Sequence, residues 1–171
     1  MAGFSWPAVA GRPGTVYDTE VTPVLTVAVA TDGNEYVFLK GVASTIQGSW
    51  VTYDEAGVTA GIDSDVAASI TGDVAIATAA VVANKFGWYG RSGHFICGAI
   101  SGGDAAADGK VFATATVFLT DDVAVTGNQI HGALYRTQEG EANTALGLDA
   151  TAALATAQIN RPFIGVTDAI I

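Results

Sequence analysis

Short apolar runs separated by turns that contain Asp and Gly form the basic pattern of this chain. Residues 36–39 are one such run, and residues 49–53 are the next. Asp32 and Gly33 precede the first run, and the turn signal of residues 54–57 follows the second. Asp can hydrogen-bond to the backbone two residues ahead, and Gly adopts a positive φ without a steric clash. The pattern therefore predicts β-strands joined by tight turns.

The same alternation of side chains predicts strands along most of the remaining chain. In residues 24–30 the side chains of Leu25, Val27 and Val29 share one face, and residues 111–119 show the most regular alternation of all. The other predicted strands cover residues 58–62, 74–80, 84–100, 130–135 and 158–166.

Three local features refine this prediction. Gly90 to Gly93 interrupt the segment 84–100 and predict either a bend or the turn of a hairpin. In the connection before residue 49, Ile46 is the expected buried anchor. Arg161 and Pro162 predict an edge position for the last strand, because proline donates no hydrogen bond to a ladder.

Two stretches leave the choice between helix and strand open. In residues 63–72, Asp63 and Asp65 can cap a short helix. Residues 145–157 are rich in Ala, which favours helices, but a strand of small residues fits them equally well. We therefore expect a mainly all-β fold, a small β-barrel or sandwich with at most one or two short helices.

The chain divides into an extended N-terminal arm, residues 1–23, and a single β-rich domain, residues 24–171. Three prolines prevent a continuous helix in the arm, whose large apolar side chains need a surface to cover them. The arm either folds back on its own domain or lies across a neighbouring subunit. The apolar C-terminal tail is also expected to dock on a surface. The candidate partner-contact residues are Phe4, Trp6, Pro7, Tyr17, Ile170 and Ile171.

Composition and charge exclude several classes of function. The formal net charge is −10, and the seven Lys and Arg residues are scattered, so no cationic cluster is available to bind nucleic acid. The N-terminus has no signal-peptide pattern, and the longest apolar stretch, residues 74–83, is too short to span a bilayer. We expect a soluble protein synthesised in a cytoplasm, with no membrane partner. The single cysteine, Cys97, excludes an intrachain disulfide.

No pattern of catalytic residues emerges from the sequence. His94 and Cys97 are three residues apart, which places them on opposite faces of a strand. Residues 103–110 superficially resemble a phosphate-binding loop, but the glycine spacing is too long and Val111 replaces the required Ser or Thr. We expect no enzymatic activity and no cofactor.

Metal and sugar sites are also weakly indicated. The aspartate pairs lack the spacing of a calcium loop, so we interpret them as solvated turn residues and expect no metal. Trp50, Trp88 and Tyr89 could form a platform for sugar rings, although packing in a core or an interface is the favoured interpretation. The aspartate pairs are Asp63 with Asp65, Asp104 with Asp108, and Asp121 with Asp122.

The order of these segments resembles that of a known family. Residues 32–41 (DGNEYVFLKG) lead to residues 50–57 (WVTYDEAG), then to the aromatic residues 85–89 (KFGWY) and to residues 106–115 (AADGKVFATA). This order is similar to that of capsid decoration, or cement, proteins of tailed bacteriophages, of the β-barrel type rich in Ala, Gly, Val and Thr. The resemblance covers residues 24–135; the arm and the chain beyond residue 137 depart from it.

The resemblance implies a structural virion protein. Such proteins bind the outer surface of an expanded icosahedral capsid, often as homotrimers, and clamp neighbouring capsomers. It implies the major capsid protein and further copies of this chain as partners, and synthesis in the host cytoplasm. Two alternatives remain: a carbohydrate-binding β-module on a virion surface, and another structural protein of a phage head or tail.

Overall fold

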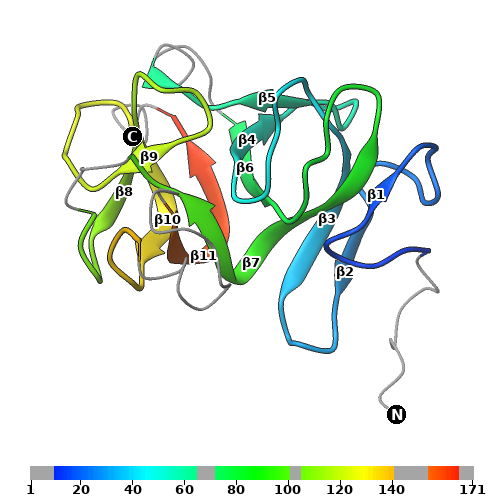
Figure 1. Ribbon diagram of the computed structural model, residues 1–171, viewed down its shortest axis with the longest axis horizontal. Helices are drawn as coiled ribbons and strands as arrows, with labels where there is room; N and C mark the ends of the chain where they lie inside the picture. The colour runs from blue at the N-terminus through cyan, green and yellow to red at the C-terminus, as the bar shows by residue number, and fades with distance from the viewer. Residues whose placement is uncertain (1–9, 65–71, 101–104, 141–153, 166–171) are drawn as a thin grey trace, which may run out of the picture.

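The structure is a computed structural model that describes residues 10–64, 72–100, 105–140 and 154–165. Within these residues the chain forms eleven strands of one antiparallel sheet (Figure 1). The prediction of a mainly all-β fold is confirmed. The strands are β1 (Val16–Tyr17), β2 (Val27–Val29), β3 (Glu35–Lys40), β4 (Trp50–Tyr53), β5 (Thr59–Gly61), β6 (Gly72–Ala77), β7 (Phe86–Gly98), β8 (Lys110–Ala113), β9 (Thr120–Asp121), β10 (Gln129–Tyr135) and β11 (Leu154–Ile164).

The long strand β7 organises the sheet, because different neighbours pair with its two halves. Its first half lies between β3 and β6, with Tyr89 opposite both Val37 and Ala77. Its second half pairs with β11, from Ser92 to Gly98. Strands β1–β3 therefore lie at one end of the molecule and β8–β10 at the other, and β7 passes between them (Figure 1).

Apolar side chains cover both faces of the first half of the sheet. On one face, Phe38, Ile76 and Trp88 belong to a large core that extends toward β10 and β11. On the opposite face, Leu39 and Tyr89 belong to a second, smaller core. Strands β3, β4 and β6 are consequently buried at consecutive positions instead of alternate ones. A sheet that is covered on both faces in this way reads as a continuous apolar run in the sequence.

A bulge in β7 shows that Gly90 to Gly93 bend the strand and do not form a hairpin turn. Before the bulge, Trp88 faces the large core; after it, Phe95 and Cys97 do, so the alternation has shifted by one residue. The register against β3 shifts at the same place. Gly90 permits this geometry, because an added Cβ would lie 2.5 Å from the Phe95 ring.

Charged side chains occupy the junction where β6, β7 and β11 exchange partners. Glu35 of β3, whose side chain is only 14% exposed, accepts hydrogen bonds from Arg161 Nη2 at 3.0 Å and from Arg91 Nη1 at 3.4 Å. Arg91 Nη2 also lies 3.9 Å from Asp73 Oδ2, and Tyr53 donates its hydroxyl proton to the same carboxylate. Five strands are thus connected through one partly buried polar network.

The predicted edge position of the last strand is wrong. Strand β11 lies inside the sheet, with β10 on one side and β7 followed by β6 on the other. The ladder is irregular around Pro162: Arg161 has a φ of +44°, and the register on β10 shifts at Gly132. An added Cβ on Gly132 would lie 2.8 Å from the Asn160 carbonyl oxygen, so the two chains approach closely there.

The long strand predicted over residues 111–119 is also wrong, because the chain turns at the end of β8. The Thr114 hydroxyl donates a hydrogen bond to the Leu119 carbonyl at 3.0 Å. Phe118 adopts a φ of +71° in the turn. Thr120 then begins β9, which pairs back on β8. The residues that show this regular alternation thus form a tight hairpin and not a single strand.

The connection between β3 and β4 does not bury the residue that the sequence predicted. Ile46, the expected anchor, is 58% exposed, whereas Thr45 and Ser49 are buried. The Thr45 hydroxyl donates to the Val42 carbonyl, and the Ser49 hydroxyl accepts from the Ile46 N–H at 3.0 Å. The loop is therefore held by hydroxyl groups that satisfy its own backbone, which side-chain hydrophobicity does not reveal.

Two predictions fall largely outside the described residues. The helix or strand expected in residues 63–72 concerns residues 65–71, and most of the Ala-rich stretch 145–157 is likewise not described. The last four residues of that stretch, 154–157, form the beginning of β11.

Candidate functional site

His94 and Cys97 do not form a catalytic pair. Cys97 is fully buried in the large core, and this burial raises the pKa of its thiol far above the usual range. His94 is exposed on the opposite face of β7, where its backbone N–H donates to Asn34 Oδ1. A thiol that stays protonated and is shielded from solvent is a poor nucleophile.

The aspartates that could ligate a metal have other partners. Asp122 accepts a hydrogen bond from the Ala106 N–H at 3.0 Å, and Asp121 accepts one from the Asp122 N–H at 2.8 Å. Asp108 forms an ion pair with Arg136. No group of three or more His, Cys, Asp or Glu side chains suited to a metal ion occurs among the described residues. Two members of the predicted pairs, Asp65 and Asp104, lie outside those residues.

The predicted sugar platform is not accessible. Trp50 and Tyr89 are 0% exposed and Trp88 is 2% exposed. Trp88 packs edge-on against Phe38 with the ring centroids 5.2 Å apart. These three rings therefore belong to the cores, as the favoured interpretation of the sequence had it, and they cannot stack on a ligand in the folded protein.

One candidate partner-contact residue, Tyr17, contacts its own domain. Its strand β1 pairs with β7, and its ring lies 6.1 Å from that of Phe38. Its hydroxyl accepts a hydrogen bond from the Arg12 N–H at 2.8 Å, so residues 10–23 of the arm are part of the domain surface. Five other candidates lie outside the described residues, namely Phe4, Trp6, Pro7, Ile170 and Ile171.

A row of exposed apolar side chains follows the edge strand β2. The strand predicted over residues 24–30 is shorter than expected, since Leu25 has a φ of +65°. Val27 and Val29 are 40% and 53% exposed, while Ala28 between them packs on the large core. Leu25 and Val58 are also exposed, and Gly57, which precedes Val58, lies close to the Leu25 side chain, so we group these four residues as the β2 edge. Isolated exposed valines are common, but a contiguous group is typical of an interaction surface.

Strand β2 also has backbone groups without a strand partner among the described residues. Among the described strands, β2 pairs with β3 alone. The Thr26 carbonyl accepts from the Phe38 N–H of β3 at 2.9 Å, and the Ala30 N–H donates to the carbonyl of Asn34, just before β3, at 3.0 Å. In an antiparallel ladder the intervening residues, Val27 and Val29, then direct their N–H and C=O groups away from β3. The β2 edge thus offers hydrogen-bonding groups beside its apolar side chains.

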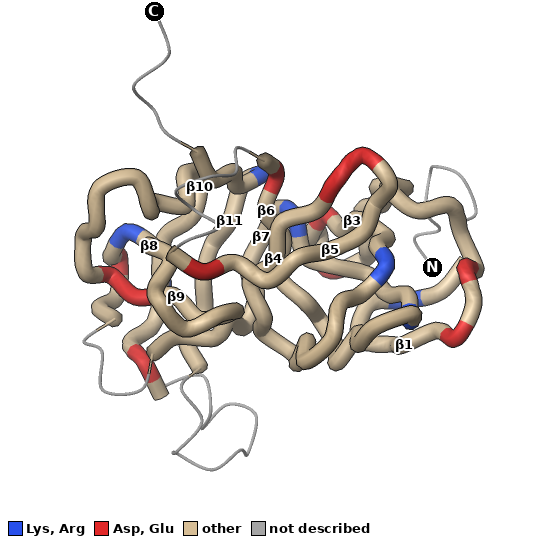
Figure 2. Tube along the Cα trace, turned by 90° about the horizontal axis from the view of Figure 1, so that it is seen from above, with Lys and Arg blue, Asp and Glu red and all other residues tan. Residues whose placement is uncertain are grey.

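Among the described residues, ion pairs engage four of the seven cations of the chain. Lys85 pairs with Asp18 at 2.6 Å, and the arginines of the junction and of β10 are paired as described above. Lys85 holds the pKa of Asp18 below its usual range. The Asp and Glu residues are spread over both ends of the molecule (Figure 2), so its described surface offers no cationic stripe for phosphate groups.

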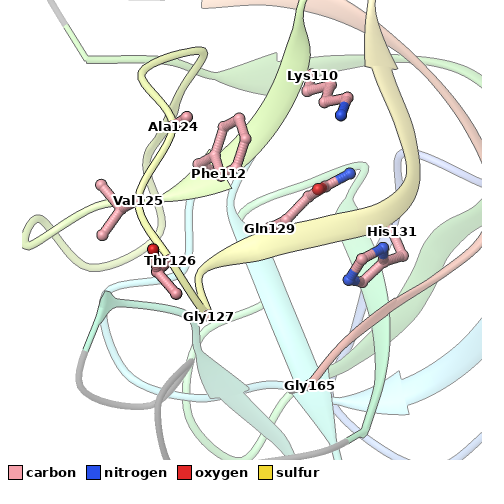
Figure 3. Close-up of a pocket in the computed structure, with 9 residues that line it drawn as sticks. All are labelled: Lys110, Phe112, Ala124, Val125, Thr126, Gly127, Gln129, His131 and Gly165. Atoms are coloured by element: carbon pink, nitrogen blue, oxygen red, sulfur yellow. The ribbon is translucent and has the colours of Figure 1, made fainter. Parts of the chain in front are cut away.

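Two surface hollows of different chemistry occur among the described residues. One, of about 420 Å³, lies on the β4–β5 hairpin and contains two carboxylates, Asp54 and Glu55, and no cation. The other, of about 290 Å³, lies over the outer face of β8 and β10 (Figure 3). Its lining residues are Lys110, Phe112, Ala124, Val125, Thr126, Gly127, Gln129, His131 and Gly165. We call this second hollow the β8–β10 hollow.

Sequence reasoning missed both the β2 edge and the β8–β10 hollow. Alternation in residues 24–30 correctly placed Val27 and Val29 on one face, but it cannot tell which face is turned to solvent. The hollow depends on the loop after β9 and on the register shift in β10 at Gly132, which are tertiary features. Lys110, Gln129 and His131 also match no recognised sequence motif, so no signal for this site was present in the sequence.

None of the described segments is a helix long and apolar enough to cross a membrane. Comparison with protein-family models, with curated proteins and with solved structures found no match for this chain.

Proposed function

We propose that this protein is a non-enzymatic structural component of a phage virion, which binds the outer surface of the capsid and stabilises contacts between capsomers. The resemblance of residues 24–135 to capsid decoration proteins supplies the identity of the partner, the major capsid protein. In this proposal the chain is made in the host cytoplasm and acts as a homotrimer on the shell.

The observation that carries the proposal is the β2 edge. Val27 and Val29 place apolar side chains together with backbone groups that have no described strand partner on one border of the sheet. A partner strand that pairs with such an edge gains main-chain hydrogen bonds and covers alternate side chains. The described clefts and side chains, by contrast, bring together no nucleophile and base, so binding is the activity that this surface supports best.

Repetition on a shell makes a modest contact sufficient. A surface of four half-exposed apolar side chains is small for a stable binary complex. On an icosahedral lattice, however, each oligomer would contact several capsomers at once, and linked contacts raise the overall affinity without any new interaction. The acidic surface would also keep the unbound protein soluble and disfavour non-specific self-association.

Substitution of Val27 by Lys is expected to weaken binding to expanded shells of the cognate capsid protein at least ten-fold, about 1.4 kcal/mol per site. The ammonium group would have to be desolvated in the contact, while the exposed position leaves the fold intact. Co-sedimentation of purified protein with shells measures the affinity. Val82→Lys is the matched control, since Val82 is also 40% exposed and lies outside the β2 edge. Equal binding by both variants would contradict the proposed contact.

Deletion of residues 1–9 tests the arm while it leaves β1 and Tyr17 in place. Deletion of all residues 1–23 would remove β1 and Tyr17, which pack on the large core. If the N-terminal residues connect neighbouring subunits, the shorter deletion should convert a homotrimer into monomers. These monomers should stay folded, with the same melting temperature as full-length protein that has been diluted until it is monomeric. Mass photometry measures this directly. A trimer that persists and still binds shells as tightly would remove the arm from the proposed contact.

A further inference from the structure

We propose that the β8–β10 hollow is a binding site for a small hydroxylated carboxylate of the sugar-acid class. The inference is independent of the proposed capsid contact, because the hollow and the β2 edge lie at opposite ends of the molecule (Figure 1). It assigns to the described surface a ligand site distinct from the buried rings that the sequence had suggested for sugars.

The first argument is the charge of the lining. Lys110 is the one charged residue among the nine that line the hollow, and no carboxylate is among them. Lys110 forms no ion pair within the described residues, unlike most cations of this acidic chain. An ammonium group without a carboxylate partner among the described residues is a local exception in this acidic protein, and it favours an anionic ligand.

Three described aspartates that lie close to the lining residues in the sequence or in the strand pairing have other partners. Asp121, opposite Phe112 in the β8–β9 pair, accepts a hydrogen bond from the backbone N–H of Asp122. Asp122 in turn accepts from the Ala106 N–H, and Asp108 pairs with Arg136. Lys110 is therefore left as the charge that a ligand in the hollow would meet first.

The second argument is the set of neutral hydrogen-bonding groups. Lys110 and Gln129 direct their polar ends toward one another, and Thr126 lies on the loop that borders the hollow (Figure 3). An amide and a hydroxyl can each donate and accept hydrogen bonds, as the hydroxyl groups of a sugar require. A simple acetate ion could use only the donors of these groups, whereas a hydroxylated ligand could also donate to their oxygen atoms.

The third argument is the apolar surface beside them. Phe112 and Val125 contribute apolar side chains to the lining of the hollow (Figure 3). The His131 ring is stacked on Phe163, with centroids 4.9 Å apart and planes 20° from parallel, which fixes the orientation of the imidazole. Apolar walls with a few convergent polar groups are typical of small-ligand sites, and about 290 Å³ is close to the lower limit of their size range.

Titration of the isotope-labelled protein with glucuronate, followed by NMR, tests the proposal. We expect saturable shifts at the backbone amides of Lys110, Gln129 and His131, weakened by added salt because the contact is ionic. Glucose, which lacks the carboxylate, should bind at least ten-fold more weakly, and acetate, which lacks the hydroxyl groups, should bind at least five-fold more weakly.

Two variants separate the site from a general charge effect. Lys110→Gln should lower the affinity for glucuronate at least five-fold, since it removes the ammonium group from an exposed position. Lys40→Gln on β3 is the matched control, because Lys40 also lacks a carboxylate partner among the described residues, and it should leave the affinity unchanged. Equal binding of glucuronate, glucose and acetate, shifts located elsewhere, or equal loss in both variants would overturn the proposal.

Discussion

Raising the pH is expected to unfold this protein in a single cooperative step between about pH 10 and pH 12. Four tyrosine side chains have a raised pKa in the folded state, in each case chiefly because they are buried: Tyr36, Tyr53, Tyr89 and Tyr135. For Tyr36 and Tyr53 the pKa rises to about 12, and it rises further for the other two. An unfolded chain releases these protons near pH 10.

The hydrogen bonds of these tyrosines explain why the folded state keeps their protons. Tyr36 donates to Asp32 at 2.7 Å and Tyr53 to Asp73 at 3.1 Å, so a tyrosinate would face a carboxylate. The Tyr135 hydroxyl shares a 2.6 Å hydrogen bond with that of Thr120, inside the large core. Ionisation would therefore cost both a hydrogen bond and the burial of a charge.

The sign and size of the effect follow from proton linkage. Because the folded pKa is raised, the contribution to stability is complete below pH 10 and is lost as the pH rises toward the folded values. In this range each tyrosine lowers the free energy of unfolding by about 1.4 kcal/mol per pH unit, and the four together lower it by about 5 kcal/mol per unit. A typical domain has only about 5–15 kcal/mol of stability in total.

Absorbance at 295 nm and near-ultraviolet circular dichroism measure ionisation and tertiary structure in the same titration. The two signals should change together, with most of the tyrosinate appearing only as the fold is lost. Tyr53→Phe, at the least buried of the four positions, should make the transition shallower. Gradual tyrosinate formation near pH 10 with an unchanged dichroism spectrum would contradict this account.

Strands with local turn signals could be predicted from the sequence. Strand β4 matches the run that ends at Tyr53, because the Asp54 side chain accepts from the N–H groups of Ala56 and Val58 and closes the turn. Strand β3 follows a similar turn, in which the Asn34 N–H donates to Asp32 at 2.9 Å. In both cases the interactions that set the boundary lie within five residues, so a short window of sequence contains them.

Features that depend on distant residues could not be predicted in this way. Alternation over residues 111–119 is compatible with a strand, but Thr114 turns the chain and Thr120 pairs back on β8. Pro162 indicated an edge, yet a bulge opposite Gly132 lets β11 stay inside the sheet. The two candidate sites could not be predicted for the same reason. The exposure of the β2 edge and the shape of the β8–β10 hollow depend on how the strands are arranged in space.

Substitution of Gly41 by Ala is expected to destabilise the fold by at least about 3 kcal/mol, at the upper end for overpacked interiors. Gly41 follows β3 and is buried, and its N–H donates to the Lys85 carbonyl at 2.8 Å. An added Cβ would lie 1.8 Å from the Val81 carbonyl oxygen and 2.8 Å from that of Val82. The obstacle is backbone, so no rotation of a side chain can relieve it.

The surrounding contacts prevent the backbone from moving aside. The Val81 side chain is fully buried in the smaller core, and its carbonyl oxygen accepts the Tyr89 hydroxyl. Displacing that carbonyl would therefore disturb the packing of two core residues and one hydrogen bond. Gly33→Ala is the matched control: it introduces the same methyl group at a φ of +82° with no atom within 4 Å. That change should cost only about 1 kcal/mol, the penalty of a left-handed conformation. Urea denaturation measures both variants, and a loss for Gly41→Ala no larger than that for Gly33→Ala would show that the connection before β7 can rearrange.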